Sequence, residues 1–134
     1  MREILFRGKR ESDNKWIYGY LSDCNEISNI NTVDMSREEV DDDTIGQWTG
    51  FMDENRTYIF EGDVLQYKYS IDDFEKPGTY RSVVTFKNGI FCLDNDEEMS
   101  LSYIFWKTDD ELNVLGNIYD NPELMKLCRA NKSK

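Results

Sequence analysis

The apolar residues of this chain come in short runs, and residues that favour turns separate these runs. Residues 64–69 are the clearest example, because apolar and polar side chains largely alternate there. An Asn88-Gly89 dipeptide stands between the runs 80–86 and 90–93, and this arrangement is the strongest short signal for a hairpin. The pattern therefore predicts a fold built mainly from short β-strands.

The remaining runs predict the rest of the fold in outline. Further strands are expected at residues 4–6, 15–21, 44–48, 58–60 and 112–119, with a weaker strand or a loop at 26–33. The segment 99–106 fits either a strand or a short helix. The spacing Ser-x-x-Glu at residues 36–39 is that of a capping box and predicts a short helical turn. A C-terminal helix is expected, with Asn121 as N-cap and Pro122 in the first helical position.

The chain is expected to form one domain. It has 134 residues, the size of an ordinary domain, and no linker rich in Gly, Ser or Pro divides it. We therefore predict a mainly β domain over residues 1–130, a small barrel or pseudo-barrel of short antiparallel strands with a short C-terminal helix. Residues 131–134 are expected to fray.

The composition excludes several classes of function. Lysine and arginine number 16 against 27 aspartates and glutamates, which gives a formal net charge of −11. Direct binding to nucleic acid is therefore not expected, since neutralising phosphates needs clustered basic residues. The chain has no histidine, which removes the usual general base and the commonest metal ligand. We expect no cofactor and no metal.

The cysteines and the hydropathy predict the compartment. Cys24, Cys92 and Cys128 lie far apart and lack the spacing of a zinc site, so we expect three free thiols in a reducing compartment. No apolar run approaches the length of a membrane span, and the N-terminus lacks the apolar region of a signal peptide. The sequence thus predicts a cytoplasmic protein with no membrane partner.

Four phrases of the sequence stand out. They are REILFRGK at 2–9, QWTGFMDEN at 47–55, IFEGDV at 59–64 and VLGNIYDNPEL at 114–124. In this order, they resemble the YopX-like proteins that temperate phages and prophages of bacteria encode. The last phrase is highly specific, and the resemblance spans almost the whole chain.

Two stretches depart from that family pattern. The family often has Gly between the turn Asn and the strand at 58–60, where this chain has Arg56 and Thr57, and residues 26–44 match no pattern of the family. The resemblance implies a single YopX-like domain over 1–130 and an accessory role in a phage or prophage, in the cytoplasm of the host bacterium. It implies no catalytic residues.

The aromatic residues are the first candidates for a functional surface. Trp16, Tyr18 and Tyr20 occupy alternate positions, so they point to one face of the strand expected at 15–21. Together with Trp48 they are the candidate protein interface, and a protein of the host or the phage is the expected partner. Binding to a second copy would be the simplest case. Alternatively, this face packs under a covering loop.

A second candidate is a group of polar residues. Glu61 and Asp63 flank Gly62 between two strands, and paired carboxylates can do acid–base chemistry. A hydrolase or transferase, with or without Mg²⁺, is therefore an alternative function. Asn117 and Asp120 form a further polar group where a strand meets the C-terminal helix. Turn formation and helix capping explain the same residues more simply.

The charged residues leave two further alternatives open. If the three acidic runs gather on one surface, the protein could mimic DNA and bind a basic host protein. The runs are 38–43, 94–98 and 109–111. A single-stranded DNA-binding barrel would instead need a gathered basic stripe. The basic residues available for it are Arg7, Lys9, Arg10, Lys15, Lys68, Lys76, Arg81 and Lys87.

Overall fold

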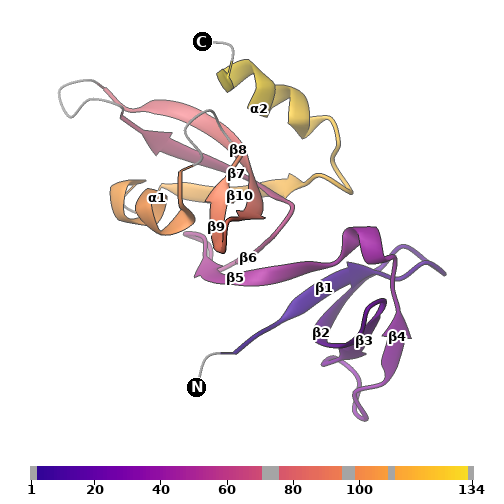
Figure 1. Ribbon diagram of the computed structural model, residues 1–134. Coiled ribbons are helices and arrows are strands. Elements are labelled where there is room, and N and C mark those ends of the chain that lie inside the picture. The colour runs from indigo at the N-terminus through magenta and orange to yellow at the C-terminus, as the bar shows by residue number, and fades with distance from the viewer. Residues whose placement is uncertain (1–2, 71–75, 95–98, 109–110, 133–134) are drawn as a thin grey trace. The chain divides into compact units, whose positions relative to one another are not determined.

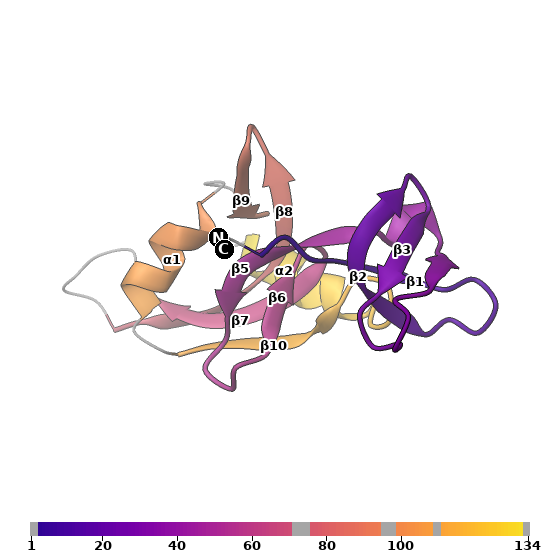
Figure 2. The same ribbon diagram turned by 90° about the horizontal axis from the view of Figure 1, so that it is seen from below.

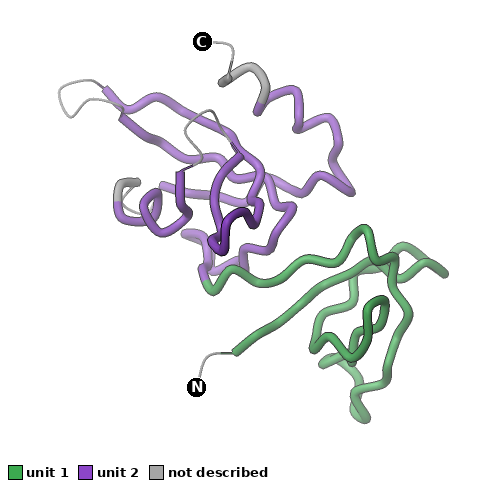
Figure 3. Tube along the Cα trace, in the orientation of Figure 1, with its two compact units in different colours: residues 1–50 green, residues 51–134 purple. Residues whose placement is uncertain are grey.

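The computed structural model describes residues 3–70, 76–94, 99–108 and 111–132 (Figure 1). The elements are β1 (Phe6–Lys9), β2 (Trp16–Asp23), β3 (Glu26–Asn29), β4 (Arg37–Glu39), the 3₁₀ turn η1 (Asp42–Thr44), β5 (Gly46–Met52), β6 (Tyr58–Phe60), β7 (Asp63–Tyr69), β8 (Gly78–Lys87), β9 (Ile90–Leu93), α1 (Leu101–Thr108), β10 (Leu112–Asn117) and α2 (Leu124–Lys132). The chain divides into two compact units, Met1–Gly50 and Phe51–Lys134 (Figure 3). The expectation that residues 1–130 form a single domain stays a prediction.

The strands form two antiparallel sheets. One has the order β4-β3-β2-β1-β5-β6 and the other the order β10-β7-β8-β9. The expected fold class, mainly β with short antiparallel strands and a short C-terminal helix, is confirmed. No closed barrel forms among the described residues. In the first unit, an isolated bridge between Arg10 and Val40 joins the residue after β1 to the residue after β4, so the sheet curls back on itself there.

The first unit encloses a small core of its own. Ile17, Ile27 and Val40 are buried together, and Phe6 and Ile45 pack against them. Ile17 belongs to β2, and its neighbours Trp16 and Tyr18 lie on the opposite face of that strand because side chains alternate along a strand. The core thus decides which face of β2 the aromatic residues occupy.

In the second unit, the two helices cover opposite faces of the four-stranded sheet. Leu101 and Ile104 of α1 are buried against one face, in a cluster that includes Leu65 of β7. Cys128 of α2 is buried against the other face with Val64, the residue beside Leu65. The near-continuous apolar pattern at the start of β7 therefore reflects burial on both faces.

The hairpin predicted from the Asn-Gly dipeptide is present. Lys87 pairs with Ile90, and Asn88 and Gly89 have φ angles of 54° and 83°. Two consecutive positive φ angles are those of a type I′ turn, which the right-handed twist of hairpin strands favours. The β8–β9 hairpin projects from its unit in Figure 2.

One element was predicted wrongly. Residues 36–39 form no helical turn, because β4 pairs there with β3 and the Ser36 carbonyl accepts a hydrogen bond from the Asn29 N–H (2.9 Å). A short helical turn instead lies at η1, where the Asp41 carboxylate accepts a hydrogen bond from the Asp43 N–H (3.0 Å). The ambiguous segment after Met99 is helical and forms α1.

Candidate functional site

The candidate aromatic surface lies on β2. Trp16 and Tyr18 are half-buried and Tyr20 is 43% exposed, so exposure rises along this face of the strand. On the opposite face, Ile17 and Gly19 are buried. The structure therefore brings the three predicted aromatic side chains together on one face, which we call the β2 aromatic face.

Two cations join this face, and the sequence interpretation did not place them there. The pairing of β1 with β2 sets Arg7 opposite Tyr18 and Lys9 opposite Trp16. Cζ of Arg7 lies 4.5 Å from the centre of the Trp16 ring, and Nζ of Lys9 lies 5.7 Å from it. Both distances are within the range of cation–π attraction. Arg7 and Lys9 are two residues apart, a spacing that places both on one face of a strand. The sequence did not show which strand pairs with them.

Trp48 belongs to the same face of the sheet. Its N–H donates a hydrogen bond to the Leu5 carbonyl (2.8 Å), which continues the register in which Arg7 pairs with Gly46. Residues that lie opposite each other in an antiparallel pair share a face, so Trp48 lies on the side that carries Leu5 and Arg7. Its side chain is half-buried.

The candidate polar residues gather where β7 begins and β10 ends. Asp63 is paired with Asn117 in the sheet register and is almost fully buried, at 2% exposure. One of its carboxylate oxygens, Oδ2, accepts a hydrogen bond from the Phe60 N–H (2.8 Å). The half-buried Glu61 lies two residues before it. The N–H of Ile118 donates to the Gly62 carbonyl (3.0 Å). The sequence phrases at 59–64 and 114–124 are therefore joined directly.

Asn117 organises the turn between β10 and α2. Its Oδ1 accepts hydrogen bonds from the N–H groups of Tyr119 (3.0 Å) and Asp120 (2.8 Å). Its Nδ2 donates to Oδ2 of Asp120 (3.2 Å). A side chain that binds its own backbone in this way replaces the hydrogen bonds lost where a strand ends. Asn117 and Asp120 therefore hold this turn together.

The role expected for Asn121 needs correction. Its side-chain Oδ1 accepts a hydrogen bond from the N–H of Asn117 (3.2 Å), at the end of the preceding strand. Its backbone carbonyl accepts from the N–H of Leu124 (3.0 Å), and α2 begins at Leu124. Asn121 thus ties the helix back to β10 through its side chain, and Pro122 lies in a turn ahead of the helix.

Asp53 is a structural anchor that the sequence interpretation missed. Its Oδ1 accepts hydrogen bonds from the N–H groups of Asn55 and Thr57, both 2.9 Å long. Its Oδ2 accepts a hydrogen bond from the N–H of Val114 on β10 (3.0 Å). The turn at 53–55 was predicted from the sequence. The hydrogen bond with Val114, 61 residues further along the chain, could not be predicted.

The chemistry of these carboxylates is that of turn formation. Asp53 and Asp63 are buried and accept hydrogen bonds from backbone N–H groups, and Asp120 accepts one from Asn117. Such bonds satisfy backbone groups that would otherwise be costly to bury. A catalytic role for Glu61 and Asp63 stays a prediction.

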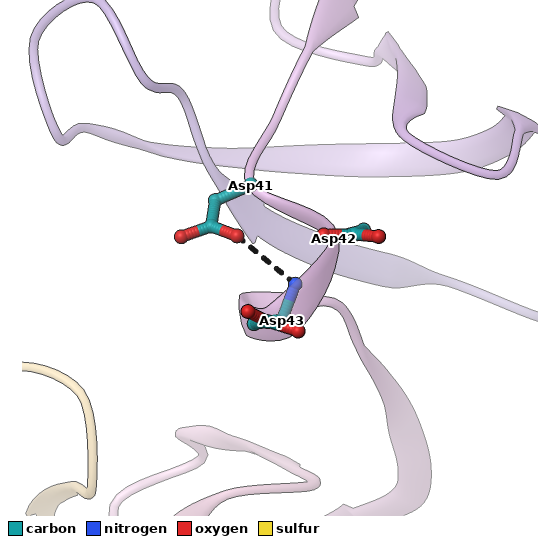
Figure 4. A group of neighbouring side chains, drawn as sticks. All are labelled: Asp41, Asp42 and Asp43. Atoms are coloured by element: carbon teal, nitrogen blue, oxygen red, sulfur yellow. Dashed lines mark hydrogen bonds between the residues drawn. The ribbon is translucent and has the colours of Figure 1, made fainter.

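Three acidic side chains lie together at η1 (Figure 4). Carboxylate oxygens of Asp41, Asp42 and Asp43 lie within 4.8 Å of one another, and Asp41 is half-buried while the other two are exposed. Asp41 uses one oxygen to cap the turn. Most of the second and third acidic runs, at 95–98 and 109–110, lies outside the described residues. Whether the runs gather on one surface therefore stays a prediction.

Two of these basic residues, Arg10 and Lys68, lie close to carboxylates. Arg10 forms a two-pronged contact with Asp13 (3.0 and 2.7 Å) and a third bond with Glu38 (2.8 Å). The hydrogen bond from Arg10 lowers the pKa of the Asp13 carboxyl to about 2. Lys68 lies 3.7 Å from Glu111. These carboxylates offset charges that a basic stripe would need.

The cysteines and the helices bear on the remaining expectations. Cys24 is exposed, Cys92 and Cys128 are buried, and all three are free thiols. Within the described residues, neither helix has the length and apolar character needed to cross a membrane.

Comparison with known proteins places this geometry in a family. The description "YopX protein" belongs to the family model that matches residues 5–126. No curated protein matches the chain. Among solved structures, the chain is similar to protein EF1440 from Enterococcus faecalis, with 24% sequence identity and a TM-score of 0.56 over 93% of this chain and 99% of that one. This likeness supports the fold alone. Of the phrases that suggested the family, those at 59–64 and 114–124 are joined by a hydrogen bond in the second unit, and those at 2–9 and 47–55 meet where β1 pairs with β5. The chain belongs to the YopX protein family.

Proposed function

We propose that this chain is an accessory protein of a temperate phage or prophage that works by binding another protein through the β2 aromatic face. The observation that carries the proposal is the arrangement of Trp16, Tyr18 and Tyr20 on one face of a strand. Aromatic side chains present large apolar areas at little entropic cost, and Trp, Tyr and Arg are enriched where binding energy concentrates.

The arrangement of the ring of Trp16 supports this role. Arg7 and Lys9 lie over its ring within the range of cation–π attraction, which favours this position of the indole before any partner binds. A side chain that is already ordered loses less entropy on binding. Tyr20, 43% exposed, supplies the accessible end of the same face. The partner is a protein of the host or the phage, and a second copy of the chain is the simplest such partner.

The experiment compares two residues of the same strand. Tyr20 and Leu21 are both 43% exposed, but they point to opposite faces of β2. The protein is used as bait in host lysate, captured proteins are identified by mass spectrometry, and the affinity of each purified candidate is then measured. Self-association is followed in parallel by analytical ultracentrifugation.

The proposal predicts a difference between two variants. Tyr20→Ala should weaken binding about tenfold or more, which corresponds to roughly 1.4 kcal/mol. Leu21→Ala, the matched control, should leave the affinity within about twofold, because its side chain lies outside the β2 aromatic face. Equal effects of the two variants on every confirmed partner would refute the role of this face.

A further inference from the structure

A row of aromatic rings runs from the core of the second unit to its surface. Neighbouring ring centres lie 6.1 Å apart for Tyr67 and Tyr80, 6.1 Å for Tyr80 and Tyr69, 6.4 Å for Tyr69 and Tyr103, and 6.1 Å for Tyr103 and Trp106. Exposure rises from 1% at Tyr67 to 38% at Tyr103 and 75% at Trp106. The row therefore ends on α1 in a pair of rings that reach solvent.

Folding of the helix leaves the side chain of Trp106 largely exposed, at 75%. The same helix buries Leu101 and Ile104 completely, so its core-facing side is already occupied. A tryptophan placed only for stability would bury most of its large ring. The Tyr103 ring packs beside it, and the N–H of Tyr103 donates to Oγ of Ser100 (3.2 Å) at the start of the helix. The pair is thus presented from an ordered helix.

The charge of the chain selects the kind of ligand. The faces of aromatic rings carry partial negative charge and attract ammonium and guanidinium groups. The chain has a formal net charge of −11. An acidic protein favours the approach of a cationic partner and disfavours an anionic one.

The geometry points to the Tyr103–Trp106 pair as a binding site for an arginine side chain, or a lysine side chain, of a basic protein segment. This inference rests on the proposed protein-binding role, but it concerns residues of the second unit, whereas the β2 aromatic face belongs to the first. The planar guanidinium can lie flat on the indole ring of Trp106, while Tyr103 borders it.

The test uses two peptides that differ only in charge. One is the blocked tripeptide Gly-Arg-Gly, and the other has citrulline, a neutral near-isostere, in place of arginine. Each is titrated into the labelled full-length protein, and chemical shifts of the Trp106 indole N–H and the α1 backbone amides are followed by NMR. The arginine peptide should produce saturable shifts at α1, with an affinity about two- to fivefold higher than that of the citrulline peptide, the range of exposed cation–π contacts.

Variants separate the rings from the overall charge. Trp106→Leu and Tyr103→Leu keep the net charge and an apolar side chain, so each should lower the affinity for the arginine peptide about two- to fivefold. Phe86→Leu, at an exposed aromatic ring elsewhere in the second unit, is the control and should leave the α1 shifts unchanged. Equal affinities for the two peptides, or no loss in either α1 variant, would overturn the inference. A result of this kind would leave the Tyr20 comparison untouched, so the two proposals can fail separately.

Discussion

The ring of Tyr119 occupies the space beside Gly62 that a side chain would need. A Cβ placed on Gly62 would lie 2.9 Å from Cε2 of Tyr119, closer than real Cβ contacts allow. Gly62 also has a φ of +89°, a conformation that other residues adopt only with strain. The Glu-Gly-Asp phrase is therefore fixed by its contact with the Gly-Asn-Ile-Tyr-Asp phrase, which lies far along the chain.

The first prediction concerns Gly62→Ala. The positive φ should cost about 1–2 kcal/mol, and the collision with Tyr119 about 1–3 kcal/mol more, in the free energy of unfolding. Gly89→Ala is the matched control, because Gly89 has a φ of +83° but nothing lies within 4 Å of its Cβ position. Urea unfolding, followed by NMR signals of the second unit, should show the larger loss for Gly62→Ala. Equal losses would mean that the Tyr119 contact does not constrain this position.

The second prediction concerns Asp53. Asp53→Ala removes the acceptor for the N–H groups of Asn55, Thr57 and Val114, and we expect a loss of about 2–4 kcal/mol in the free energy of unfolding. Glu54→Ala, at the exposed neighbouring position, should change it by less than about 0.5 kcal/mol. Hydrogen exchange of the Val114 amide gives an independent readout, since this N–H should exchange faster in Asp53→Ala. Unchanged protection of this amide would contradict the role of Asp53 as an anchor.

These turns show why the sequence predicted part of the site and missed the rest. Structure that depends on neighbouring residues was predicted correctly, as in the Asn88-Gly89 hairpin and the turn that begins at Asp53. Contacts between distant segments were not, because nothing in a single sequence pairs Asp53 with Val114 or Gly62 with Tyr119. The alternation of Trp16, Tyr18 and Tyr20 gave their common face correctly, since that depends on the strand period alone.

The wrong prediction at 36–39 has the same origin. Ser36 and Glu39 have the spacing of a capping box, and local propensity favours a helical turn there. Pairing with β3 is stronger, because Glu38 also accepts hydrogen bonds from Asn29 (2.9 Å) and Arg10 (2.8 Å) across the sheet. Tertiary contacts of this kind routinely override a weak local preference.

The third prediction concerns the pKa of the Asp13 carboxyl. The hydrogen bond from Arg10 lowers the pKa of the Asp13 carboxyl to about 2, so the charged form is favoured in the folded protein. A lowered pKa stabilises the fold above the unfolded pKa of about 3.9, and this contribution disappears as the pH falls through about 2. NMR titration of the Asp13 carboxyl should give a midpoint near 2 in the folded protein. In Arg10→Gln the midpoint should rise towards about 3.9, and an unchanged midpoint would contradict the assigned cause.

The last prediction concerns the turn that Asn117 builds. Asn117→Ala leaves the N–H groups of Tyr119 and Asp120 without their acceptor, and Asn117 is only 8% exposed, so water cannot fully replace it. We expect a loss of about 2–3 kcal/mol in the free energy of unfolding. Asn113→Ala, on the same strand, removes only one long exposed contact (3.4 Å) with Asn55 and should cost less than about 0.5 kcal/mol. Because Asn121 bonds to the backbone N–H of Asn117 and not to its side chain, Asn121→Ala should add a separate loss of about 1 kcal/mol in the double variant. A double variant no less stable than Asn117→Ala alone would show that the two asparagines act as one unit.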